Sequence, residues 1–234
     1  MPRKFHQLPG IGEVLFVKRR NSKNLRLTID SRGQVKVSLP LWAPYAIGTA
    51  FVKSRRDWIA QRVAKQKPPR LHPGARIGRK HRLQFIRQPG LKRDRTRVAD
   101  CRITITSSLP FEAESVQAIA YSACERALKI EAQTVLPPRL KEQARRHGYR
   151  YGKVRVKKLT SRWGSCSAQN DVSLSYFLIQ LPAELIDYVI LHELIHTRYL
   201  NHGPDFWVAF TKALPAARRL QKQIRTYHPR VEPT

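Results

Sequence analysis

Residues 191–196 read Leu-His-Glu-Leu-Ile-His, and His202 follows six positions later. Two histidines four positions apart on a helix lie about 40° apart around its axis, so the imidazoles of His192 and His196 can reach one ion. Glu193 can then accept a proton from water bound to that ion. His202 would complete the three protein ligands that catalytic zinc takes when one coordination position stays open. The alternative interpretation is a buried helix whose two histidines belong to the core and bind no metal.

The residues around this motif predict two helices joined by a turn. Pro182 begins an apolar segment typical of a buried central helix, and Pro204 is well placed as the first residue of the next helix. Residues 201–204 (Asn-His-Gly-Pro) force a turn that can return His202 to the metal, although a histidine in such a turn can also face solvent. Asp205 lies in the first turn of the second helix, where it can hydrogen-bond a ligand imidazole or only stabilise the helix start.

The overall composition indicates a folded protein with no membrane span. A chain of 234 residues, 41% of them apolar, can form one large domain or two small ones. No apolar run approaches the roughly 20 residues that cross a bilayer, and no secretory apolar region follows the first residues. The three cysteines are widely spaced, which favours free thiols in a reducing compartment. We therefore expect a cytoplasmic protein.

The charge balance is strongly basic. Lysine and arginine total 45 against 16 acidic residues, which gives a formal net charge of +29. A surface of this kind attracts polyanions through its long-range field and through counterion release. Nucleic acid, nucleotides and other phosphorylated molecules are therefore candidate partners, while a charge that serves only solubility is the alternative.

The remaining chain predicts an α+β fold in two parts. Period-two patterning in residues 13–39 predicts a small antiparallel sheet, and residues 46–65 have helical spacing. Further strands are expected within residues 71–88 and at 102–106, which gives a β-rich N-terminal part with one helix over residues 1–110. Residues 111–234 are expected to form a helical part with a small sheet and the central helix that carries the motif. Its first long helix spans about 112–146, and the prolines at 137 and 138 predict a kink or a break.

Substrate contacts are expected from the turn-rich stretch at 161–166 (Ser-Arg-Trp-Gly-Ser-Cys) and from Arg198. Arg162 and Arg198 can bind phosphate or carboxylate groups, whereas Trp163 has an equally good explanation in packing. The alternating strand at 171–175 can offer an edge to an extended peptide. Cys166 is not expected to act as a nucleophile, because no histidine accompanies it in this stretch.

Together, the stretch at 161–166, the stretch at 187–196 (Asp-Tyr-Val-Ile-Leu-His-Glu-Leu-Ile-His), Asn201-His202 and Phe206-Trp207 closely resemble the YgjP-type metal-dependent hydrolases. That family is metallopeptidase-like and related to the SprT-like and gluzincin peptidases. The resemblance covers most of the chain, and implies a zincin-like catalytic part in residues 111–234. It also implies one Zn2+ per chain, held by His192, His196 and His202, with Glu193 as general base. Residues 174–176 (Leu-Ser-Tyr) depart from the family, whose members often carry asparagine there.

Three functions remain open on these grounds. The first is a zinc-dependent, metallopeptidase-like hydrolase in which Glu193 activates the metal-bound water. The second is a nucleoside triphosphate (UTP) pyrophosphatase that uses the same metal site, since that activity is also attached to part of the family. The third is a nucleic-acid-binding protein with a non-catalytic metal site, although such a site would need no base. The substrate is accordingly a peptide or a nucleotide.

Overall fold

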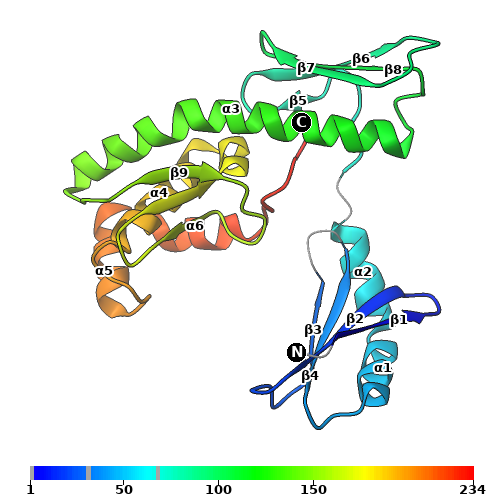
Figure 1. The fold of residues 1–234 in the computed structure, drawn as a ribbon. Helices are drawn as coiled ribbons and strands as arrows, with labels where there is room; N and C mark the ends of the chain where they lie inside the picture. Colours follow the sequence, from blue (N-terminus) through cyan, green and yellow to red (C-terminus); the bar gives the residue numbers. More distant parts are fainter. Residues whose placement is uncertain (1–2, 30–32, 67–68) are drawn as a thin grey trace. The chain divides into compact units, whose positions relative to one another are not determined.

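The computed structural model describes residues 3–29, 33–66 and 69–234, and its contacts divide the chain into two units, Met1–Pro68 and Pro69–Thr234 (Figure 1). Both units combine helices and sheets, so the α+β class expected from the sequence is confirmed. None of the described helices is long and apolar enough to span a bilayer.

The first unit is a four-stranded sheet with two helices. The strand order is β1 (Arg3–Leu8), β2 (Gly12–Arg19), β4 (Val35–Pro40), β3 (Arg26–Ile29). Strand β1 lies outside the residues where strands were expected, and it pairs antiparallel with β2, as β3 does with β4. Strands β2 and β4 run parallel, so the sheet is mixed and not antiparallel as expected. The single helix expected at 46–65 is divided at Arg55 into α1 (Tyr45–Ser54) and α2 (Arg56–Gln66). Alternating residues of β2 and β4 supply the sheet side of this unit's core, and both helices contribute to it as well: Val14, Phe16, Val35, Val37, Leu39, Val52 and Ile59.

The second unit begins with another four-stranded sheet. Its order is β5 (Arg76–Ile77), β6 (His81–Arg87), β8 (Arg102–Ser107), β7 (Arg95–Ala99). Leu83, Ile103 and Ile105 alternate with exposed or partly exposed residues and are buried in the core that includes α3 (Glu114–His147). The boundary expected between residues 110 and 111 therefore falls inside this unit. An apolar sheet face must be covered, and here α3 covers it, which joins the sheet to the helices that follow.

Helix α3 runs through Pro137 and Pro138 as one helix, so the prolines do not break it; a kink was the other expectation. It ends at Gly148, whose φ of 68° is the left-handed conformation that glycine adopts most easily at a helix C-terminus. The helix forms the common wall of the unit: the sheet β5–β8 lies along it, and the layer with β9, α4 and α6 packs against it as well (Figure 1).

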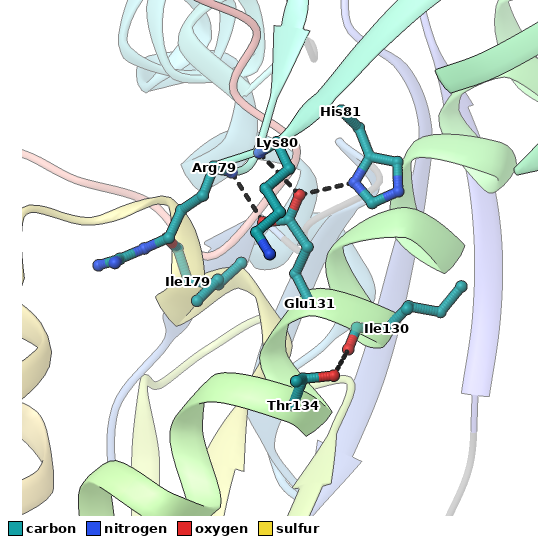
Figure 2. Close-up of polar contacts among 7 residues, drawn as sticks. All are labelled: Arg79, Lys80, His81, Ile130, Glu131, Thr134 and Ile179. Carbon is teal, nitrogen blue, oxygen red and sulfur yellow. Dashed lines mark hydrogen bonds and ion pairs between the residues drawn. The ribbon is translucent and has the colours of Figure 1, made fainter. Parts of the chain in front are cut away.

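A buried carboxylate fixes the β5–β6 turn to α3. Glu131 accepts hydrogen bonds from the backbone N–H of Arg79 (2.7 Å) and of Lys80 (3.0 Å), and from His81 Nδ1 (2.6 Å) (Figure 2). Its side chain is 5% exposed. A Cβ on Gly78 would lie 2.7 Å from Glu131 Oε2, so the turn approaches the helix too closely for a larger residue.

The remaining elements of the second unit form a small sheet and three helices. The sheet order is β10 (Gly164–Cys166), β11 (Val172–Ser175), β9 (Val154–Lys157), followed by the 3-10 turn η1 (Tyr176–Gln180). The helices are α4 (Ala183–Ile195), α5 (Pro204–Ala213) and α6 (Ala217–Ile224). Helix α4 is apolar on most sides and buried, as predicted. The guanidinium of Arg139 on α3 donates hydrogen bonds of 2.6 and 2.9 Å to the carboxylate of Asp187 on α4, which fixes the two helices to each other.

Candidate metal centre

Three histidine nitrogens converge at the end of α4. His192 lies in the last turn of α4, His196 follows that helix directly, and His202 lies in the turn before α5. His192 Nε2 is 3.1 Å from His196 Nε2 and 3.0 Å from His202 Nε2. A metal-ligating atom of each histidine lies within 4.8 Å of the others. The structure therefore brings together the three residues that the sequence motif predicted as ligands.

The surroundings orient these imidazoles. His196 Nδ1 lies 2.9 Å from the carbonyl oxygen of Tyr199, so a proton on Nδ1 is donated to that oxygen and Nε2 is left with a free lone pair. The ring of Phe206 packs against all three histidine rings, with centroid separations of 4.7 to 5.2 Å. Burial, followed by the charges of His196 and His202, lowers the pKa of His192 to about 3. His192 is thus neutral and able to act as a ligand.

The arrangement fits a divalent cation. Two nitrogens that each lie about 2.0 Å from a tetrahedral zinc ion are separated by roughly 3.3 Å. The observed separations of 3.0 and 3.1 Å are close to that value. Three lone pairs that point at one another also repel unless a cation or a proton lies between them. His192, His196 and His202 can therefore hold one metal ion and leave a coordination position open.

Glu193 is buried beside the histidine cluster, with 6% of its surface exposed. Burial raises the pKa of Glu193 to about 8, while the positive charge of Arg162 opposes that rise. A Cβ on Gly164 would lie 2.7 Å from both Cγ and Oε1 of Glu193, so the carboxylate lies directly against the backbone of β10. Because Glu193 approaches the backbone this closely, position 164 has no room for a side chain and glycine is required there.

An open hollow of about 310 Å³ contains both the histidines and Glu193. Its lining residues are Arg162, Gly164, Ser165, Cys166, His192, Glu193, His196, Leu200 and His202. Of the expected substrate residues, Arg162 lies in this hollow. Gly164, Ser165 and Leu200 were not singled out as site residues from the sequence, although the first two belong to the stretch that carries the family resemblance. Burial, then the charges of Glu193 and Asp171, raises the pKa of the Cys166 thiol, which disfavours a nucleophilic thiolate.

Three other predicted residues lie outside the lining of the hollow. Trp163 packs against the core and lines a separate cavity of about 440 Å³. Arg198 donates a hydrogen bond to the carbonyl of Gly148, and its guanidinium lies 4.9 Å from the ring centroid of Tyr149. Asp205 is exposed in the first turn of α5, and no hydrogen bond among the described residues joins it to a ligand histidine.

The strand edge beside the metal centre is also not the expected one. Strand β11, which corresponds to the strand expected at 171–175, is the central strand of its sheet because it pairs with β10 on one side and β9 on the other. It therefore cannot accept a further strand. Strand β10 lies at the edge of the sheet and lines the hollow. Any extended peptide that adds to this sheet near the histidines must pair with β10.

Comparison with known proteins gives one family and two solved structures. A family model described as YgjP-like, metallopeptidase domain, matches residues 23–227. The metallopeptidase zymogen abylysin of Pyrococcus abyssi is 24% identical, with a TM-score of 0.37, over 39% of this chain and 93% of that one. The metallopeptidase zymogen jannalysin of Methanocaldococcus jannaschii is 20% identical, with a TM-score of 0.36, over 39% of this chain and 94% of that one. No curated protein matches the chain.

Proposed function

Because the chain belongs to the YgjP-like family and carries its metallopeptidase domain, we propose that it is a zinc-dependent peptidase that cuts an extended peptide bound along β10. The family supports a metal-dependent hydrolase, and the three histidines are able to hold the metal. One observation carries the proposal: the histidine cluster, the buried Glu193 and the edge strand β10 all line one hollow. A structural metal site would need neither the carboxylate nor the open wall.

The residues of the hollow have distinct roles in this proposal. A zinc ion on His192, His196 and His202 would acidify its bound water and polarise the substrate carbonyl. Glu193, whose raised pKa the positive charge of a bound cation would lower, takes the proton from the attacking water as a carboxylate and returns it to the leaving amine. Gly164 lets that carboxylate lie against β10, whose outer edge would hydrogen-bond the substrate backbone. Arg162 supplies a positive charge at the same wall, where it can bind a substrate carboxylate.

A second candidate is hydrolysis of a nucleoside triphosphate at the same site. It is supported by Arg162 in the hollow and by the net charge of +29. Either activity fits a reducing cytoplasm, since Cys101, Cys124 and Cys166 are free thiols. A nucleic-acid-binding protein with a non-catalytic metal is the third candidate, and it leaves the burial of Glu193 beside the histidines unexplained.

The test compares the full chain with Glu193→Gln and with Glu184→Gln as a matched control. Glu184 lies on the same helix but is exposed and paired with Arg219. We expect about one zinc per chain in all three proteins by elemental analysis. Peptide-library turnover should fall by roughly 10²- to 10⁴-fold in Glu193→Gln alone, the range associated with a general base.

Each other outcome selects a different function. Zinc retention with unchanged turnover in Glu193→Gln would exclude Glu193 as the base. Release of pyrophosphate from nucleoside triphosphates without peptide cleavage would select the second candidate. A protein that holds zinc, cuts neither substrate and binds nucleic acid would select the third.

A further inference from the structure

The sheet β5–β8 has an outer face that the metal centre does not use. Helix α3 runs along one face of this sheet (Figure 1). Alternation along the strands buries that face in the core and leaves the other exposed. The exposed face carries five arginines, which we name the arginine face: Arg76, Arg82, Arg95, Arg97 and Arg102.

Strand register places three of these arginines in one row. Arg76 of β5 pairs with Arg82 of β6, and Arg82 pairs with Arg102 of β8. Arg97 of β7 is opposite Thr104 and therefore lies diagonally next to Arg102. Like charges directly opposite each other on neighbouring strands destabilise a sheet. The repulsion within this row therefore lowers the stability of the sheet, and a bound anion would reduce that repulsion.

The arginine face has little negative charge of its own. Among the described residues, no ion pair within 4.0 Å joins any of its five arginines to a carboxylate. The face is hollowed to about 240 Å³ between Arg97 and Arg102, where Gln84 and Thr104 add polar side chains. Asp100, in the β7–β8 turn, is the carboxylate that borders this hollow. Positive charge thus dominates a surface that also offers uncharged hydrogen-bonding groups.

We infer that the arginine face binds single-stranded nucleic acid. A polyanion with regularly spaced charges suits a row of guanidinium groups, which bind phosphate bidentately and also stack on unpaired bases. Four strands about 4.8 Å apart span about 14 Å between the outer strands. That width exceeds the roughly 12 Å major groove, so the face cannot enter a duplex to reach its bases, whereas the bases of a single strand are open to stacking by the arginines.

This binding is independent of the proposed peptidase activity. It uses residues of β5–β8, whereas the hydrolytic site uses α4, β10 and the turn before α5. Either function can therefore fail in an experiment without affecting the evidence for the other.

The test measures fluorescence anisotropy of a labelled 20-mer of oligo(dT), of oligo(rU) and of a 20-base-pair duplex with the full chain. We take four arginines to neutralise one phosphate each, and the logarithm of the binding constant to fall by about 0.7 per contact for each tenfold rise in salt. Raising monovalent salt from 50 to 200 mM should then weaken single-strand binding about 50-fold. Arg82→Gln/Arg102→Gln should bind more weakly and lose only about 7-fold over the same range. Arg145→Gln/Arg146→Gln is the matched control, because it removes two exposed arginines from the last turn of α3.

The salt dependence of the control should equal that of the unmodified chain. Equal weakening by the two double variants would show that net charge alone causes binding and would overturn the inference. Tighter binding of the duplex than of either single strand, or no binding at 50 mM salt, would overturn it as well. Circular dichroism melts of both variants confirm that each is folded.

Discussion

The sharpest stability prediction concerns Glu131, the buried carboxylate in Figure 2. Glu131→Ala removes three acceptor contacts, of 2.6, 2.7 and 3.0 Å, from one side chain. It leaves the N–H groups of Arg79 and Lys80 and the ring of His81 without their acceptor. The contact with His81 is buried and the two backbone donors are partly buried. Each buried donor left unsatisfied costs about 1–3 kcal/mol, and the partly buried ones cost less because water can reach them.

We therefore expect Glu131→Ala to lower the free energy of unfolding by about 3–5 kcal/mol. For a unit of this size each kcal/mol lowers Tm by roughly 2–4 °C, which gives a fall of roughly 6–20 °C. Urea titration and thermal melts followed by circular dichroism measure both quantities. Glu142→Ala is the control, since Glu142 is exposed on the same helix and should change stability by no more than about 0.5 kcal/mol.

Two results would refute this reasoning. A loss below about 1 kcal/mol in Glu131→Ala would mean that water replaces the carboxylate, so that the three contacts add little. Full stability in Glu131→Gln would mean that the second carboxylate oxygen is dispensable, because an amide offers one acceptor where two oxygens serve Arg79 and Lys80.

Two further predictions test the hydrolytic site and the core. Gly164→Ala should keep zinc but reduce turnover roughly 10- to 100-fold. The alanine Cβ would displace Glu193, and a catalytic group displaced by about 1 Å can lower the rate about 100-fold. Gly203→Ala, where a Cβ meets nothing within 4 Å, should leave turnover unchanged, and equal rates in both variants would count against the assigned geometry. Burial raises the pKa of Cys124 to about 12, so its thiol stays protonated at pH 8. Cys124 should therefore react with a thiol reagent only when the protein unfolds, whereas the exposed Cys101 should react at once. Rapid modification of Cys124 in the folded protein, located by mass spectrometry, would show that the core opens there.

Local sequence was sufficient for the elements that carry the metal ligands. The spacing of His192 and His196 depends only on helix geometry, and the apolar residues between Pro182 and His196 predicted a buried helix that α4 confirms. The turn at 201–204 likewise predicted the return of His202, because Pro204 restricts the backbone there and begins the next helix.

Features that depend on distant partners were not predictable in the same way. Alternation identified β8 and β11 as strands, but it does not specify a neighbour, so the central position of β11 and the edge position of β10 came only from the structure. Strand β10 has three residues, too few to show a period. Arg162 and Arg198 are both basic residues near the motif, and only the folded turns bring the first to the hollow and hold the second at Gly148.

The spacing of the metal ligands also has a consequence for the order of folding. His192 and His202 are ten positions apart, and closing such a short loop costs little chain entropy. The ligands can therefore gather once α4 and its following turn form, whereas Glu193 acquires Arg162 and Gly164 as neighbours only when β10 docks. In the function proposed above, a chain that folds in this order would gather its metal ligands before its general base is positioned.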